Sequence, residues 1–593
     1  MVDPKEAVGG VTDNGAKPLR LLPERRLHRF FVFAAIAVLS MAGAYPFGSK
    51  SYQDWIYFDR LRLIFRAAFR DYDFVAFHDP WKCGGLDLLA NPQTRAFSPF
   101  LLLDITAHPH WANLLTLIIL AGFGAWGMYR YLRHLGIGGN ASFVASLTYI
   151  ASTWFALHYL EGHIAYATFQ IFPWIFLAWD RFDERPYRLL IMVLLAFCLV
   201  EGGFYTFIFS FYWFATTLVV SIMPLRRIVT ALKDIGFTLG TMLVFILLSL
   251  PKTFPIITEL ADRTPELEYF GVPLQTTLLA LFVPIQRSTY PSGLEHVSYH
   301  EISCYLGLFQ VGLLLWTMRK KAFLKGNWKW FVLLVFWFWT GSGWIEDANP
   351  WSVFIHRLPL FNNAHVQSRT WFLMFVVFTV LFARAFDQAS FGRWQLWIAV
   401  FLFAESFVVR NVPFEYYRQR PAQAWASEFG EHNVTLEETD VDYNFFPNRG
   451  SVNCYEPAKM FDTKALAHNH ADYMGEIYPL KPGVTADIVS YKAGHLIFWV
   501  KPVHRGTKKA YIEVNTNDLG HWQVHSNNGV VVSERGMLLQ LMIDLDPNEP
   551  ETFVDVRYRP NYLWPVTGLY GLGILMAAAM FWWTRRARGG AES

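Results

Sequence analysis

Apolar segments long enough to cross a bilayer recur along most of the chain, and this recurrence constrains the fold most strongly. Membrane-spanning helices need about 17–25 predominantly apolar residues. The 593 residues are 53% hydrophobic and 18% aromatic, and only 17% are charged. That composition is too apolar for a soluble protein of this size. The sequence therefore predicts a mainly α-helical, polytopic membrane protein.

Basic residues between the apolar segments predict how the chain is oriented. Arg25, Arg26 and Arg29 adjoin the first apolar segment, which places the amino terminus in the cytoplasm. Each transmembrane helix places the following loop on the other side of the membrane. With about twelve such helices, all the short loops rich in Lys and Arg lie on the cytoplasmic side. Omitting the short segment Leu189–Val200 would reverse the later orientation, against six basic clusters. We therefore expect an integral membrane protein with both termini cytoplasmic.

The same reading divides the chain into regions. Residues 1–27 are expected to form a disordered cytoplasmic tail, and 28–410 a transmembrane domain with large exoplasmic loops at 46–111 and 251–302. Residues 411–560 are expected to form a β-rich exoplasmic domain, 561–585 the last transmembrane helix, and 586–593 a cytoplasmic tail.

Short alternating segments within 411–560, bounded by Gly, Asn and Pro, indicate the strands of a small β-sandwich. These segments are His495–Val500, Lys509–Asn515, Gly529–Ser533, Met537–Ile543 and Thr552–Tyr558, with Tyr473–Pro482 as a candidate edge strand.

Charge and cysteine content exclude some functions. A net charge of +3 is too small to indicate nucleic-acid binding. The four cysteines lack metal-ligand spacing, so they indicate neither a cysteine zinc site nor a disulfide framework.

The stretch Phe47–Trp111, between the first two apolar segments, is the strongest candidate for chemistry. It contains Asp54, Asp59, His78 and Asp79, together with the pair Gly84-Gly85. Long loops between helices are rarely mere connectors, and these residue types can shape a pocket and transfer protons. We interpret the stretch as a catalytic loop. The alternative is that the acids are solvated and the glycines form an ordinary turn.

Further ionisable residues fall where predicted helices meet the exoplasmic surface. Such groups are costly at helix ends unless they are paired, hydrated or used. Glu161, Glu201 and Glu301 are candidates to surround one cavity, and His300 and His365 lie on the same side. Arg369 opposes the positive-inside trend, so it is the basic residue that best suits an anionic ligand. Glu161-Gly162-His163 has the alternative interpretation of a plain polar turn.

Several segments resemble the YfhO family of bacterial membrane proteins, over nearly the whole chain from Phe30 onward. They are "DPWKCGGLDLLANPQTRAFSPFLLL", "EGHIAYATFQIFPWIFLAWD", "EISCYLGLFQVGLLL", "AHVQSRTWFLMFVVF", "NDLGHWQVHSN" and "VRYRPNYLWPVTGLYGLG". That family is similar to the GT-C glycosyltransferases, which use lipid-phosphate-linked sugars on the outer side of the membrane.

The resemblance implies roles for particular residues. An acid of the first outer loop would be the catalytic base, with Asp54 first and Asp59 and Asp79 as alternatives. The departing phosphate needs cationic or imidazole donors, for which Arg369, His163 and His365 are candidates. The wider set of substrate-binding candidates adds His78, Glu161, Glu201 and Glu301.

The implied partners are a polyprenyl-phosphate-linked sugar, membrane lipids and an envelope glycan or lipid acceptor, without nucleic acid. The resemblance implies a location in the bacterial inner (plasma) membrane. It implies no particular cofactor, and a divalent cation (Mg²⁺ or Mn²⁺) is a candidate. The alternative function is a transporter or flippase, or an assembly scaffold, for lipid-linked glycans. Transporters tend to place ionisable groups near the midplane in repeated halves, whereas the acids here cluster at helix ends.

Overall fold

A computed structural model describes most of the transmembrane region and the carboxyl-terminal β-sheets. The described residues are 26–42, 50–51, 54–71, 75–80, 84–260, 271–283, 299–302, 304–355, 357, 366–419, 423–424, 434–436, 449–451, 464–466, 470–532 and 538–589. The chain is mainly α-helical with a β-sheet region near its carboxyl end, as the sequence predicts.

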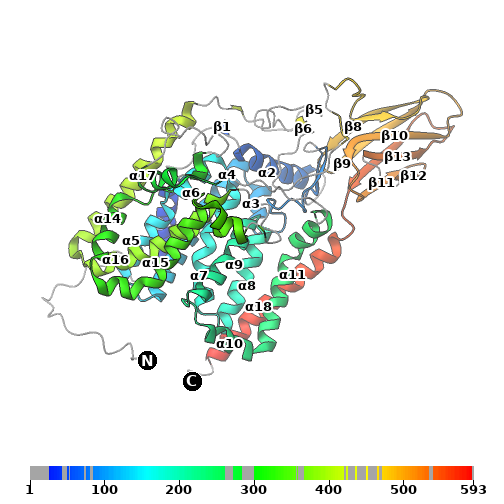
Figure 1. Ribbon diagram of the computed structural model, residues 1–593. Helices are drawn as coiled ribbons and strands as arrows, with labels where there is room; N and C mark the ends of the chain where they lie inside the picture. Colours follow the sequence, from blue (N-terminus) through cyan, green and yellow to red (C-terminus); the bar gives the residue numbers. More distant parts are fainter. Residues whose placement is uncertain are drawn as a thin grey trace.

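The helices form a bundle (Figure 1). Its first half contains α1 (Arg26–Ala42), α2 (Asp54–Asp71), α3 (Leu101–Thr106), α4 (Pro109–His134), α5 (Gly139–Ile150), α6 (Thr153–Glu161), α7 (Phe172–Asp180), α8 (Arg185–Val200) and α9 (Phe204–Val219). The remainder contains α10 (Leu225–Lys233), α11 (Ile235–Leu260), α12 (Leu274–Phe282), α13 (Tyr299–Ile302), α14 (Leu308–Met318), α15 (Lys321–Gly341), α16 (Trp371–Ala389), α17 (Gln395–Gln419) and α18 (Leu563–Gly589).

Among the described residues, four segments are long and apolar enough to cross a membrane. They are Pro109–His134, Ile235–Thr258, Gln367–Ala389 and Leu563–Arg586. Shorter apolar helical segments occupy Phe31–Ser40, Phe204–Val219, Leu308–Met318 and Gln395–Glu405. These lengths and compositions are those of an integral membrane protein.

Two segments expected to be single crossings are interrupted helices. The expected span Asn140–Leu157 consists of α5 and α6, and Ser152 between them caps α6 by accepting a hydrogen bond from the Phe155 amide. The expected span Ile164–Trp179 begins as the 3-10 helix Ile164–Ile171 and becomes α7 next to Pro173. Serine and proline favour helix starts, so both breaks have a local cause.

Helices α8, α11 and α18 are packed side by side, and contacts at both ends fix their direction. Near the amino ends of α8 and α11, Arg185 and Arg188 pair with Asp234, and the Arg185 guanidinium lies 4.8 Å from the Trp583 ring centroid near the carboxyl end of α18. At the other end, the rings of Phe254 and Tyr562 are 5.2 Å apart. Helices α11 and α18 are therefore antiparallel.

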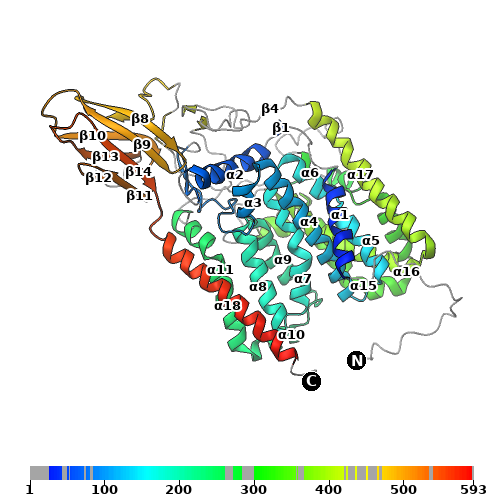
Figure 2. The ribbon, with the colours of Figure 1, turned by 180° about the vertical axis from the view of Figure 1, so that it is seen from behind.

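The stretch interpreted as a catalytic loop is largely folded. It contains the helix α2, the hairpin β2 (His78–Asp79) and β3 (Leu86–Asp87), and the helix α3 (Figure 2). Along α2, Trp55, Phe58, Leu61, Phe65 and Ala68 form a buried apolar stripe, and polar residues on other faces of the helix, including Asp59 and Arg62, are buried as well. The i, i+3, i+4 spacing of the apolar stripe is typical of a helix, although no helix was predicted here.

Two four-stranded sheets form a sandwich near the carboxyl end. One sheet has the order β12-β13-β10-β7 and the other β11-β14-β9-β8, and every neighbouring pair is antiparallel. The strands are β7 (Ile477–Pro479), β8 (Val484–Lys492), β9 (His495–Pro502), β10 (Lys509–Asn517), β11 (Trp522–Ser526), β12 (Val530–Val532), β13 (Leu538–Asp544) and β14 (Thr552–Tyr558). All six predicted segments contain a strand, whereas β8 and β11 were not predicted.

Alternating residues from both sheets meet in one apolar core, which includes Phe498, Ile512, Leu541 and Val554. This burial pattern explains why the alternation in the sequence located the strands. The short pairs β1 (Lys50–Ser51) with β4 (Gln423–Ala424) and β5 (Val434–Leu436) with β6 (Arg449–Ser451) lie outside the sandwich.

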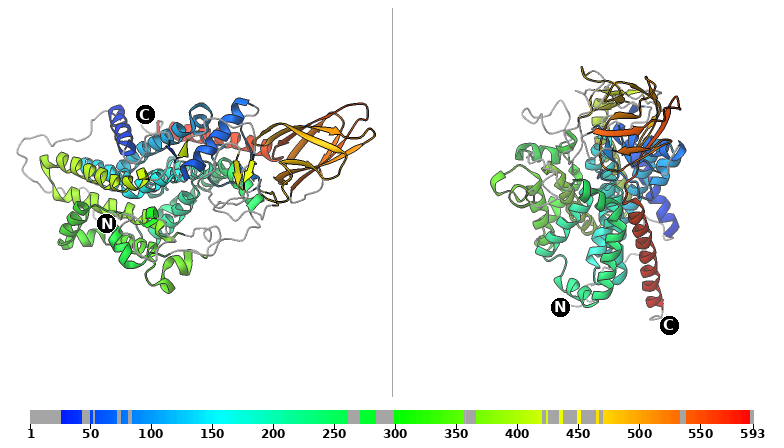
Figure 3. Two further views of the ribbon diagram at one scale, coloured as in Figure 1. Left: turned by 90° about the horizontal axis from the view of Figure 1, so that it is seen from above. Right: turned by 90° about the vertical axis from the view of Figure 1, so that its right-hand side faces the viewer.

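The sandwich projects beyond one end of the helical bundle, and α18 runs from it back along α11 (Figures 1 and 3). The basic helix α10 and the carboxyl end of α18 lie at the opposite end of the bundle from the sandwich.

Candidate functional site

Four of the predicted site residues converge in one cluster, which we call the histidine cluster. Its members are His158, Glu161, His163, His300, Glu301 and Arg369. All except the half-buried His163 are less than 10% exposed. Charged groups this deeply buried are stable only when they pair with one another or with a ligand.

The turn after α6 brings two of the histidines together. Gly162 ends α6 in the left-handed region with φ +99°, and the His163 amide donates to the His158 carbonyl at 2.9 Å. Glycine reaches this conformation without strain, so the chain folds back on the helix end. The two imidazole Nδ1 atoms then lie 2.9 Å apart.

The remaining members come from two segments far along the chain. Arg369, in the 3-10 turn Gln367–Thr370, donates from Nε to both oxygens of Glu301 at 3.0 and 3.1 Å and from Nη1 to the Tyr205 hydroxyl at 2.7 Å. His300 in α13 lies between two carboxylates, with Nδ1 3.5 Å from Glu161 and Nε2 3.4 Å from Glu301.

The charged groups around α13 determine the protonation states of its His300 and Glu301. Burial lowers the pKa of His300, but the Glu161 and Glu301 carboxylates outweigh it and raise that pKa to about 9. Burial raises the pKa of Glu301, but Arg369 and His300 outweigh it and hold that pKa well below its usual range. In the absence of another cation, the cluster therefore holds ionised Glu301 beside protonated His300.

The amino end of α2 lies beside this cluster. The Trp55 indole donates to the Tyr159 carbonyl at 2.7 Å, and Tyr159 directly follows His158 in α6. Trp55 is fully buried. Asp54 is the first residue of α2, so its backbone lies next to this contact. The side chain of Asp54 lies outside the described part of the chain, as does all of His365.

The other two candidate acids are buried and hydrogen-bonded. Asp59 accepts from Asn113 Nδ2 at 2.6 Å and lies 3.5 Å from His110 Nδ1. Asp79 accepts from Arg60 Nη2 at 2.7 Å. The interpretation of these two residues as solvated loop acids is wrong, because their exposure is only 1% and 2%.

Glu201 belongs to a different cluster, which we call the Arg95 network. Arg95 donates from Nε to Asp104 at 2.8 Å and from Nη1 to Glu201 at 2.9 Å, and the Ser98 hydroxyl bonds the second Glu201 oxygen. Arg62 lies 3.3 Å from Asp104. The expected group of three glutamates is thus divided, with Glu161 and Glu301 at His300 and Glu201 at Arg95.

His78 lies where the β2–β3 hairpin meets the sandwich. Its fully buried ring is 4.8 Å from Trp522 and 4.9 Å from Tyr558, centroid to centroid. The Asn517 amide donates to the Gly84 carbonyl at 2.6 Å. Gly85 has φ +114°, and a Cβ there would lie 2.4 Å from Thr516 Oγ1, so only glycine fits. The glycine pair is therefore a docking turn.

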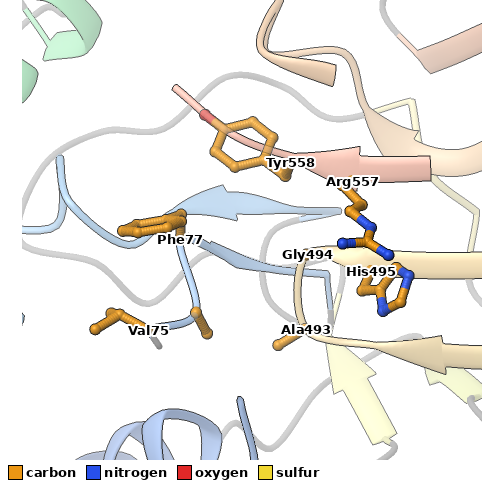
Figure 4. Close-up of a pocket in the computed structure, with 8 residues that line it drawn as sticks. Val75, Phe77, Ala493, Gly494, His495, Arg557 and Tyr558 are labelled. Atoms are coloured by element: carbon orange, nitrogen blue, oxygen red, sulfur yellow. The ribbon is translucent and has the colours of Figure 1, made fainter. Parts of the chain in front are cut away.

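A small pocket lies beside this junction (Figure 4). It is lined by Val75 and Phe77 from the chain before the hairpin, by Gly494 and His495, and by Arg557 and Tyr558 from β14. Asp555 binds both His495, at 2.9 Å, and Arg557, so the polar groups here are internally paired.

The buried imidazole predicts an acid-sensitive junction. Burial lowers the pKa of His78 to about 3, against about 6.5 for an unfolded histidine. Between these values the unfolded chain binds more protons, so stability falls as the pH falls. We expect the thermal midpoint of the full chain in detergent to drop less from pH 7 to pH 5 in His78→Gln than in the wild type. The exposed control His504→Gln should keep the wild-type dependence. Equal slopes for His78→Gln and wild type would contradict the assignment.

Sequence reasoning missed His158 and the Arg95 network. His158 is an ionisable residue near the end of an apolar helix. The same criterion selected its neighbours Glu161 and His163, so it could have selected His158 too. Arg95 and Asp104 lie in a segment treated as a loop, and no spacing links them to Glu201.

Comparisons with known proteins find few matches. No family model and no curated protein match the sequence. Among solved structures, a cryo-EM structure of the arabinofuranosyltransferase AftD from Mycobacteria is similar with 14% identity and a TM-score of 0.37, covering 67% of this chain and 27% of that one. A mutant of the same enzyme gives 15% identity, a TM-score of 0.37, and coverage of 66% and 28%. This chain thus spans little more than a quarter of that enzyme, and a likeness this weak supports no argument.

Proposed function

We propose that this chain is a membrane glycosyltransferase of GT-C type. It transfers a sugar from a polyprenyl-phosphate donor to an exoplasmic glycan or lipid of the cell envelope. One observation carries the proposal: the hydrogen bond from the Trp55 indole to the Tyr159 carbonyl ties the start of α2, where Asp54 is the first residue, to the helix that carries His158. Such a transfer requires a carboxylate near the acceptor hydroxyl and cationic groups near the departing phosphate, and Asp54 and Arg369 are the residues proposed for these roles.

In this reaction, Asp54 takes the proton of the acceptor hydroxyl as the acceptor oxygen bonds to C1 of the sugar. The bond between C1 and the phosphate oxygen breaks, and polyprenyl phosphate leaves with the electron pair. Arg369 and the imidazoles of the cluster stabilise the phosphate charge. Asp59 and Asp79 are less suitable as the base, because each is already held by a buried partner.

The topology proposed with this function has about twelve spans and both termini in the cytoplasm, with the region 411–560 outside. Contacts between distant helix ends support it. Gly138 and Asp387, both predicted inside, share a hydrogen bond of 3.0 Å, and Glu301 and Arg369, both predicted outside, form an ion pair. The polar cluster then faces the exoplasmic side.

Membranes containing this chain should transfer label from at least one member of a panel of radiolabelled polyprenyl-phosphate sugars to envelope material. Membranes from cells with an empty vector are the control. Release of polyprenyl phosphate should match the sugar transferred. Movement of intact labelled donor across the bilayer, with no new glycosidic bond, would instead favour the transporter alternative.

A further inference from the structure

Four side chains of the histidine cluster are arranged so that they can share one ion. His158, His163, His300 and Glu301 each offer one ligand atom, and these atoms all lie within 4.8 Å of one another. Three of the four side chains are buried and His163 is half-buried. They come from the end of α6, the turn after it and α13, so only the tertiary structure brings them together.

The first two imidazoles face each other through the same type of nitrogen. Nδ1 of His158 and Nδ1 of His163 are 2.9 Å apart. A neutral imidazole has one N–H and one lone pair, so this contact needs opposite tautomers if it is a hydrogen bond. Two Nδ1 lone pairs directed at a common point are equally the arrangement that binds a metal ion.

The spacing between His300 and Glu301 fits two metal ligands better than a hydrogen bond. Nε2 of His300 lies 3.4 Å from the Glu301 carboxylate, beyond the 2.7–3.2 Å usual for N–H···O contacts. Tetrahedral ligands about 2.0–2.1 Å from one ion lie roughly 3.3 Å apart.

The surrounding carboxylate and guanidinium complete the arrangement. If Nε2 of His300 faces the ion, its Nδ1 faces Glu161, which is the carboxylate–histidine pairing that orients metal-bound imidazoles. Arg369 holds the Glu301 carboxylate from the other side. Both partners orient a ligand without themselves occupying the common point.

We propose that His158, His163, His300 and Glu301 bind one divalent transition-metal ion. Imidazole-rich sites suit zinc and its neighbours in the first transition row, whereas Mg²⁺ and Mn²⁺ favour oxygen ligands. The ion ties the turn after α6 to α13 beside Arg369. This inference does not depend on the proposed transfer reaction.

The test uses the full chain in detergent, stripped with a chelator and carrying no histidine tag. After dialysis against Zn²⁺ and removal of free metal, elemental analysis should find one zinc per wild-type chain. The double variant His158→Gln/His163→Gln should retain none, and Co²⁺ should give a visible d–d spectrum with the wild type alone. Glu161→Gln should bind the ion about 10–100-fold more weakly.

The matched control is His504→Gln/His525→Gln, which removes two exposed histidines of the sandwich and should keep one zinc. Zinc should also raise the thermal midpoint of the wild type and of the control, but not that of the double variant. A cooperative melting transition of each variant without zinc shows that the variant is folded. Equal zinc retention by the wild type and the double variant, or none by either, would overturn the proposal, whatever the transfer assay shows.

Discussion

Replacing Asp54 by asparagine is expected to lower the rate of sugar transfer by about 10²–10⁴-fold, which is the usual contribution of a general base. Asparagine keeps the shape and the hydrogen-bonding capacity of the side chain but cannot accept the proton. The assay is label transfer from the active polyprenyl-phosphate sugar, with donor binding and protein level measured in parallel. Both of these should stay near the wild-type values, because the loss concerns the transition state.

The controls follow from where the other acids lie. Asp472→Asn changes an exposed carboxylate and should leave transfer unchanged. Asp59→Asn and Asp79→Asn alter buried hydrogen-bonded groups, so they should lower stability and protein level along with activity. Full transfer by Asp54→Asn combined with inactive, well-folded Asp79→Asn would move the base to the hairpin.

Replacing Arg95 by methionine is expected to destabilise the protein by about 3–5 kcal/mol, the range for removing one partner of a buried ion pair. Arg95 is 0% exposed and holds both Asp104 and Glu201. Without it, two buried carboxylates lose their main counter-charge. Unfolding in detergent micelles, titrated with denaturant, measures the difference in free energy.

The matched control is Arg557→Met in the sandwich. Arg557 pairs with Asp555, but its side chain is 39% exposed, so solvent screens the pair and the loss should stay below about 1 kcal/mol. A loss below about 1 kcal/mol for Arg95→Met as well would show that water reaches the Arg95 network and that it does not hold α3 to the turn after α8.

Local patterns in the sequence located most of the regular structure. Apolar length marks a spanning segment, and alternation marks a strand with one buried face, because both reflect the immediate surroundings of each residue. The strand β14 begins and ends where the sequence predicts, at Thr552 and Tyr558. The helix α2 was within reach of the same reasoning, since its buried face repeats every three to four residues.

The sequence also identified individual residues of the histidine cluster without their geometry. Glu161, His163, Glu301 and Arg369 stood out because ionisable groups at the ends of apolar helices are costly unless they are used or paired. The packing of α6, α13 and α16 decides which of these residues are in contact. It also brings His158 and His300 into the cluster.

Only the tertiary structure decided the partners of the most buried groups. Thr516 bonds the Gly84 carbonyl across 432 residues of sequence, and Glu201 pairs with Arg95 across 106. Such pairs leave no periodic signal, because they form where separately folded segments pack together and each buried charge must find a counter-charge. The apolar helices and the strands were therefore determined by local sequence, and the composition of the candidate site by packing.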